Sequence, residues 1–188
     1  MVIDSQVGNS TVITLNENDK VYMRGNNQIA FSNGSSYTNF IMSGSIFVEG
    51  DLTCLINQVG GDAELKERQF EKLFKDCSAM VSAPSLPSSQ TATACYYELF
   101  RGCTSLTETP ILSNSVLSPL SYGYMFYGCT ALSKVTCLAT NISQMLSTDN
   151  WLYGVASSGT FVKSASMSSW TSGPTGIPSG WNVTNYNE

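Results

Sequence analysis

The 188-residue sequence contains no histidine. Histidine is the commonest general base in enzymes, so its absence removes the usual catalytic dyads and triads. The acids Asp4, Glu17, Asp19 and Asp51 stand singly in turn-like stretches, and Val59-Gly60-Gly61-Asp62 lacks the lysine and the spacing of a phosphate loop. The six cysteines contain no Cys-x-x-Cys pair, which excludes the usual zinc patterns. We therefore expect a non-enzymatic protein with no cofactor and no metal.

Charged residues are also scarce, at 12% of the chain, and the net charge is −5. Nine Lys and Arg residues cannot supply the basic patch that phosphates demand, so we expect no nucleic-acid partner. Long apolar runs are missing as well. Phe40-Ile41-Met42 and Ile46-Phe47-Val48 are separated by Ser43-Gly44-Ser45, which predicts no membrane insertion. Nothing after Met1 resembles a secretion signal, so we expect either that a signal was removed or that the protein reaches its place without one.

What the sequence does contain is an internal repeat. Cys77, Cys103 and Cys129 follow one another at a constant spacing, which is the period of the repeat. Each lies in a similar stretch, and these stretches are 70–80, 96–106 and 122–132. One further period leads to Trp151-Leu152-Tyr153-Gly154-Val155, a fourth and decayed copy. A period of this length is typical of stacked repeats, in which neighbouring units bury a shared core.

Within each copy the apolar residues fall at i, i+3, i+4 and i+7, the pattern of one helix face. The positions are Phe70, Leu73, Phe74 and Cys77, then Tyr96, Leu99, Phe100 and Cys103, then Tyr122, Met125, Phe126 and Cys129. Gly102 and Gly128 fit the left-handed position after a helix, and Asp76 is among the residues that tolerate it. Pro84, Pro87 and Pro110 favour extended chain in between. Each unit is therefore predicted to be a helix, a turn and a short strand, with the three cysteines as buried thiols.

The N-terminal part of the chain, up to position 62, has a different character, with short β-branched and aromatic runs between turn residues. These runs are 11–15, 20–24, 28–32, 39–42 and 47–48. They predict a small N-terminal antiparallel sheet or sandwich. The expected organisation is α+β, with an N-terminal β domain at 1–62, repeats at 63–165 and a C-terminal cap at 166–188, where Trp170 and Trp181 fold back on the last repeat.

The run from Met125 to Leu132 and its sister from Leu99 to Leu106 resemble the repeat of BspA-like leucine-rich-repeat proteins. The stretches 137–143, 154–163 and 177–181 resemble the ends of such chains. The resemblance covers about residues 64–183. It implies a leucine-rich-repeat solenoid of about three full repeats and one decayed repeat, and a role in adhesion at the surface of Bacteroidetes. Similar chains occur in phages that infect these bacteria. The resemblance offers no catalytic residues.

Two functions from different classes follow. The first is a recognition module outside the cell, at the bacterial surface, with a protein or carbohydrate ligand there. The second is a structural component of a phage particle in the virion, such as a head or tail fibre, with a possible homo-oligomer that would be a trimer in a fibre.

Two faces of the expected stack are candidate ligand sites. One is a strand face, because positions one period apart are brought side by side, and it comprises Thr107, Glu108, Thr109, Ser133 and Lys134. Glu108 and Lys134 are expected to form a surface ion pair there. The other is the face of the helices, with Tyr97, Tyr124 and Tyr127. Exposed tyrosines suit protein or glycan contact, although packing of these rings against neighbouring helices explains them equally well.

Overall fold

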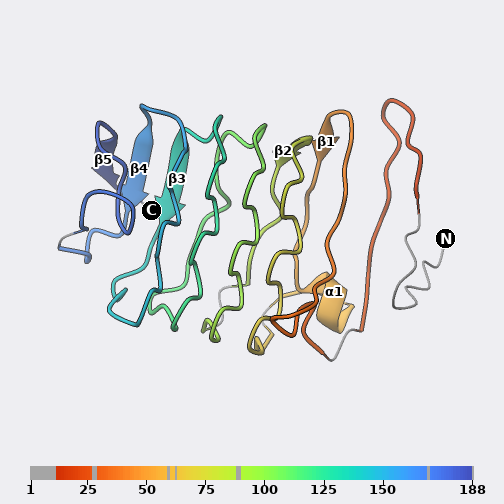
Figure 1. Cartoon of the computed structure of the whole chain (residues 1–188), viewed down its shortest axis with the longest axis horizontal. Helices are drawn as coiled ribbons and strands as arrows, with labels where there is room; N and C mark the ends of the chain where they lie inside the picture. The colour runs from red at the N-terminus through yellow and green to blue at the C-terminus, as the bar shows by residue number, and fades with distance from the viewer. Residues whose placement is uncertain are drawn as a thin grey trace.

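The computed structural model describes residues 12–26, 29–58, 60–61, 63–87, 90–168 and 170–187. Regular elements are few and short. In chain order they are β1 (Ile46–Phe47), α1 (Cys54–Asn57), β2 (Met80–Ser82), β3 (Lys134–Cys137), β4 (Thr160–Lys163) and β5 (Asn182–Asn185). Most of the described chain consists of turns and extended segments that lie side by side, with the N-terminal part at one end of the row and the C-terminal part at the other (Figure 1).

The repeated stretches form runs of consecutive β-turns, here called the turn segments, at 66–77, 92–103, 118–129 and 144–154. Their backbone N–H groups alternate in direction. In the first, Leu73 donates to the carbonyl of Phe70 three residues earlier, whereas Phe74 donates to the carbonyl of Leu99 in the next segment. The same alternation recurs in the following segments, so each turn segment is hydrogen-bonded to its neighbour along its length.

The predicted helices, and with them the helix–turn–strand leucine-rich-repeat solenoid, are therefore wrong. The only helix of the described residues is the four-residue α1. In the turn segments every fourth residue has a positive φ, as at Lys72 (62°), Glu98 (54°) and Tyr124 (53°), which no α-helix contains. The apolar pattern predicted helices because successive β-turns repeat every four residues. Over so short a run, this period is close to the 3.6 residues per turn of an α-helix.

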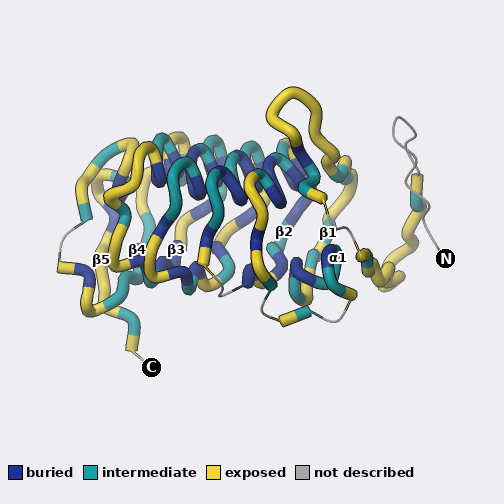
Figure 2. The backbone as a smooth tube through the Cα atoms, turned by 90° about the horizontal axis from the view of Figure 1, so that it is seen from below, coloured by how far each residue is buried: buried dark blue, intermediate teal, exposed yellow. Residues whose placement is uncertain are grey.

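The apolar positions that the pattern selected are nevertheless the core. Phe74, Phe100 and Phe126 are at most 2% exposed, and their rings stack on one another along the row. A second column of rings comprises Phe31, Phe70, Tyr96, Tyr122, Trp151 and Trp170, with neighbouring centroids 5.5–6.1 Å apart. Figure 2 shows the buried residues recurring from one segment to the next. The core is thus continuous between neighbouring segments.

The expected N-terminal antiparallel sheet is also wrong. β1 pairs in parallel with β2, so this part of the chain joins the repeats edge to edge. The one antiparallel contact in the described part of the chain is the isolated bridge between Ser32 and Tyr37. Of the expected strands, Thr11 and Gln28 lie outside the described residues. The rings of Phe31 and Phe40 stack on Phe70 and Phe74, which explains the difference, because stacking buries them against the first turn segment.

The second sheet has the order β3-β4-β5, and both pairings are parallel. Beyond β4, the chain turns back onto the last turn segment. Trp170 stacks on Trp151 with ring centroids 5.5 Å apart, and the indole of Trp181 donates to the Ala156 carbonyl. Both tryptophans therefore pack against the end of the core.

The thiols of Cys77, Cys103 and Cys129 are completely buried, as predicted. Each points its Sγ at a carbonyl oxygen of the preceding segment, those of Phe40, Phe74 and Phe100 respectively, at 3.0–3.2 Å. Among the described residues, no helix has the length and apolar character needed to cross a bilayer.

Candidate functional site

The strand face forms partly as expected. Glu108 and Lys134 lie opposite each other in a parallel bridge, and the Lys134 Nζ is 2.9 Å from Glu108 Oε2. Both side chains are more than half exposed. The row continues through Thr160 and Asn182 in the register of β3, β4 and β5. An exposed, mutually neutralised pair offers a ligand little uncompensated charge.

Other residues of the strand face form hydrogen bonds between neighbouring segments. Thr109 is only 9% exposed, and its hydroxyl accepts a hydrogen bond from the backbone N–H of Thr136. Thr109 is therefore not available on the surface. The Thr107 carbonyl accepts the N–H groups of Ser133 and Lys134, although both Thr107 and Ser133 are exposed. The strand face thus reduces to a narrow polar row.

The three tyrosines of the second candidate face come together. Tyr97 meets Tyr124 edge to face at 5.7 Å between ring centroids, and Tyr124 lies 5.6 Å from Tyr127. All three are partly buried and partly open to solvent. They lie on turn segments and not on helices, but the constant period of the repeat still aligns them.

Sequence reasoning placed Arg101 on this face as well but missed Tyr153. Arg101, Tyr127 and Tyr153 occupy one repeat position, each one period after the last, and Lys75 occupies it one repeat earlier. Tyr153 stacks on Tyr127 with centroids 5.2 Å apart and planes inclined by 19°, and it is 52% exposed. The guanidinium of Arg101 lies 4.9 Å from the Tyr127 ring centroid. The period itself was the signal that could have identified Tyr153.

We call this surface the tyrosine face and define it by Lys75, Tyr97, Arg101, Tyr124, Tyr127 and Tyr153. Its charges are organised around one buried acid. Glu98 Oε2 lies 2.8 Å from Lys75 Nζ and 3.2 Å from an Arg101 nitrogen, which ties two neighbouring turn segments together. Burial raises the pKa of Tyr97, and nearby Glu98 adds to this effect. Tyr97 therefore remains a neutral hydrogen-bonding group at any physiological pH.

A polar contact fixes the rim of the tyrosine face. The amide of Asn150 donates to the Tyr124 hydroxyl at 3.2 Å, and a second Asn150 hydrogen bond holds the Asp149 carboxylate. Aromatic rings, a cation and amide groups thus share one surface. Such surfaces suit recognition, because tyrosine combines large contact area with hydrogen bonding at low entropic cost and arginine is enriched at interfaces.

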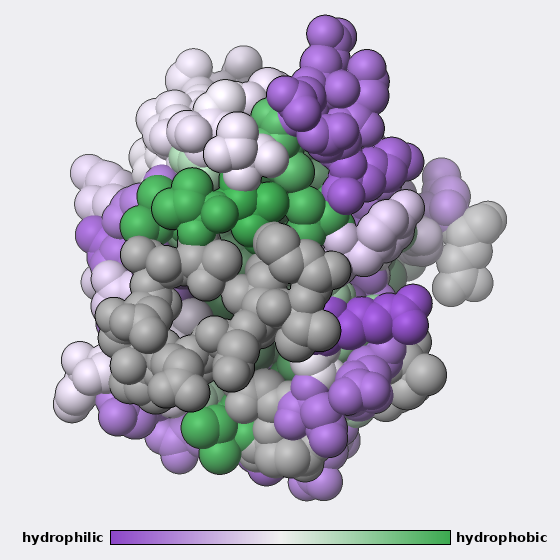
Figure 3. Space-filling view, turned by 90° about the vertical axis from the view of Figure 1, so that its right-hand side faces the viewer, coloured by the Kyte–Doolittle hydropathy of each residue, from purple (hydrophilic) through white to green (hydrophobic). Residues whose placement is uncertain are grey.

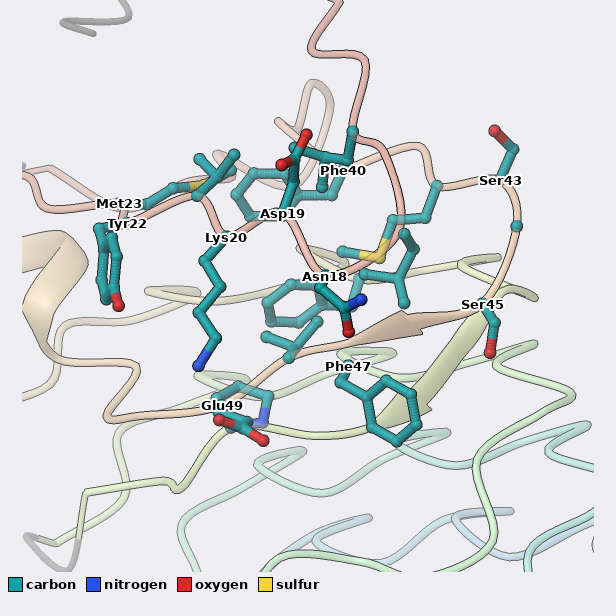
Figure 4. A pocket seen from close by; sticks show the side chains of 18 of the residues that line it. Asn18, Asp19, Lys20, Tyr22, Met23, Phe40, Ser43, Ser45, Phe47 and Glu49 are labelled. Carbon is teal, nitrogen blue, oxygen red and sulfur yellow. The ribbon is translucent and has the colours of Figure 1, made fainter.

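A groove of about 830 Å³ lies at the N-terminal end of the row, between residues 15–23 and the chain around β1. Phe40, Phe47 and Val48 are among the residues that line it. Lys20 points toward Glu49 across it (Figure 4). Figure 3 views this end of the molecule directly and shows a patch of apolar side chains with hydrophilic ones around it. The sequence did not indicate this groove.

Within the described part of the chain, no group of three Cys, Asp or Glu side chains could hold a metal ion. Comparison with protein-family models, with curated proteins and with solved structures finds no match. The function must therefore be argued from the surface itself.

Proposed function

We propose that this protein is a non-catalytic recognition module that binds a protein or a glycan at a bacterial surface through the tyrosine face. The observation that supports this most strongly is the alignment of Tyr97, Tyr124, Tyr127 and Tyr153 into one chain of ring contacts. Three neighbouring turn segments supply these residues, the decayed fourth copy among them, so the face exists only in the folded stack. The BspA-like resemblance of the repeats agrees with an adhesive role.

The tyrosine face is the better candidate of the two, because its rings and its cation remain partly accessible after packing. Arg101 keeps about a third of its side chain exposed. The strand face, in contrast, offers a neutralised pair and loses Thr109 to the interior. Aromatic rings beside a guanidinium group are typical of the residues that contribute most to binding.

Binding to arrays of glycans and bacterial surface proteins tests the proposal. We expect Tyr153→Ser to weaken attachment at least tenfold, because it removes the most exposed ring of the face without opening the core. The double variant Glu108→Gln/Lys134→Gln is the matched control on the strand face, and it should bind like the parent. Loss of binding in the control alone would place the site on the strand face instead.

A structural role in a phage particle is the second candidate function. The observation that favours it is the pair of open strand edges at the two ends of the row, since structural proteins assemble through repeated contacts.

A further inference from the structure

In the described part of the chain, the two ends of the row present complementary open edges. β5 is the last strand of the sheet β3-β4-β5, and all four of its residues are exposed. At the other end, β1 pairs with β2 on one side, and the residues Phe47, Val48 and Glu49 line the groove on the other. Neither Lys nor Pro, which commonly protect edge strands, occurs in β5.

At both edges some backbone N–H groups point away from the sheet, where they could pair with another strand. The N–H groups of Ile46 and Val48 donate inward, to Ala79 and Ser82. Because these directions alternate along a strand, the N–H of Phe47 points outward into the groove.

The same reasoning applies to β5. Asn182 and Tyr186 donate inward, to Gly159 and Lys163. The N–H groups of Val183 and Asn185 therefore point away from β4.

The two edges also agree in register. Phe47 lies opposite Ser82, and one period after Ser82 is Glu108. From Glu108 the row continues through Lys134 and Thr160 to Asn182. Counted in this way, by strand pairing and by the period between Ser82 and Glu108, Phe47 and Asn182 hold corresponding positions at the two ends of the stack.

Within the part of the chain that the structure describes, the next row of residues, Val135, Phe161 and Val183, lacks a covering strand at its C-terminal end. Val135 and Phe161 are completely buried, yet Val183, the next residue in their row, is 44% exposed, because no further strand of the described residues pairs with β5. At the other end, Val48 follows Phe47 and packs partly against the core while lining the groove. A second copy would bring Val183 of one molecule against Val48 of the next.

We propose that copies of this chain associate head to tail, with β5 of one copy docked in the groove against β1 of the next. The contact continues the parallel pairing inside the molecule. At the junction of β3 and β4, Thr160 donates its N–H to the Ser133 carbonyl. Phe47 takes the place of Thr160 in the new junction and donates to the Trp181 carbonyl of the neighbouring copy.

Such a contact joins different surfaces of identical molecules. It relates copies by a shift along the row, so it does not close on itself and yields open chains of growing length. β5 brings no charged side chain into the groove, so docking adds no further charge beside Lys20 and Glu49, which line it.

Sedimentation velocity over a wide range of protein concentration tests this proposal. The parent should form dimers and longer species as concentration rises. Val183→Pro removes an outward N–H but leaves the bonds from β5 to β4, so it should sediment as a monomer. Phe47→Pro should do the same at the other end, and Phe47→Lys is a second variant that places a charge at this exposed position.

Mixing the two blocked variants is the matched control. Each retains one working edge, so the mixture should form a dimer and nothing larger, which also shows that both variants are folded. A parent that stays monomeric, a parent that forms a closed trimer of fixed mass, or single variants that assemble like the parent would each overturn the proposal. So would a monomeric mixture of two variants that melt like the parent.

Discussion

Phe74 and Phe100 stack with ring centroids 5.6 Å apart and planes inclined by only 5°. They are one period apart in sequence, so the same position of two neighbouring repeats lies side by side in the structure. Phe40 and Phe126 extend the column on either side. The same period that aligns these rings in the core aligns the tyrosines on the surface.

Truncating the middle of this column should be costly. Phe100 is fully buried and has an aromatic neighbour on each side, so Phe100→Ala should lower the free energy of unfolding by about 3–5 kcal/mol. Phe47→Ala is the control, because that ring is 66% exposed and should cost less than about 1 kcal/mol. Urea unfolding measures both. A small loss at Phe100 would show that the ring column does not support the core.

The buried thiols should be unreactive in the folded protein. Burial raises the pKa of Cys77, Cys95, Cys129 and Cys137 to about 12, and that of Cys103 well above its usual range. Thiolate is the reactive form, so at pH 8 a thiol reagent should label only the half-buried Cys54 quickly. All six cysteines should react after denaturation without reductant. Mass spectrometry that finds Cys77, Cys103 or Cys129 modified in the folded state, or joined in disulfides, would contradict this arrangement.

Stability should fall in acid through Glu71. Burial alone would raise the pKa of its carboxyl, but hydrogen bonds from Ser32, Arg68 and Lys72 outweigh it and hold the pKa below 4.5. A carboxyl whose pKa is lowered by folding stabilises the folded state above its unfolded pKa, and this contribution disappears as pH falls through the folded value. The melting temperature should therefore decrease below about pH 4.5.

Glu71→Gln tests the origin of this acid sensitivity. The variant should start with a lower melting temperature at pH 7 and lose less of it on acidification than the parent does. Glu67→Gln is the control, since Glu67 is 66% exposed at 3.6 Å from Arg68. Equal acid profiles for Glu71→Gln and the parent would show that other groups control the response.

The ion pair on the strand face should contribute little to stability. Glu108 and Lys134 are both more than half exposed, and such pairs are worth at most about 1 kcal/mol. The double variant Glu108→Gln/Lys134→Gln should melt within a few degrees of the parent in differential scanning calorimetry. A large loss would mean that the pair holds the strands together.

The sequence predicted which residues are buried better than it predicted their backbone. The spacing of Phe70, Phe74 and Cys77 identified one buried face, because any chain that turns every three to four residues places them together. The hydrogen-bond pattern was not readable, since it depends on partners in the next turn segment and not on local preference. Lys72 and Glu98 have a positive φ, but neither residue type predicts one.

For the candidate sites as well, the sequence predicted some features and not others. The period correctly placed Glu108 beside Lys134 and brought Tyr97, Tyr124 and Tyr127 onto one surface. It did not reveal that Thr109 turns inward, because the exposure of a strand residue depends on which side carries the core. Tyr153 was missed because its repeat is decayed at the neighbouring positions.

The central claim is that non-helical turns, and not helices, build the stack that carries the tyrosine face. Leu146 tests it, because it is half exposed and has a φ of +53° in the last turn segment. Leu146→Ala and Leu146→Gly remove nearly the same side chain and differ mainly in backbone preference. The same two substitutions at the neighbouring Met145, which is 67% exposed, are the control.

The deciding measurement is the difference in unfolding free energy between the glycine and alanine variants at position 146. The turn structure predicts that glycine is the more stable by about 1–2 kcal/mol, because alanine is strained at positive φ. At position 145 alanine should be the more stable. In a helix, alanine would be favoured at both positions by about 1 kcal/mol. Alanine ahead of glycine at position 146 would contradict the account.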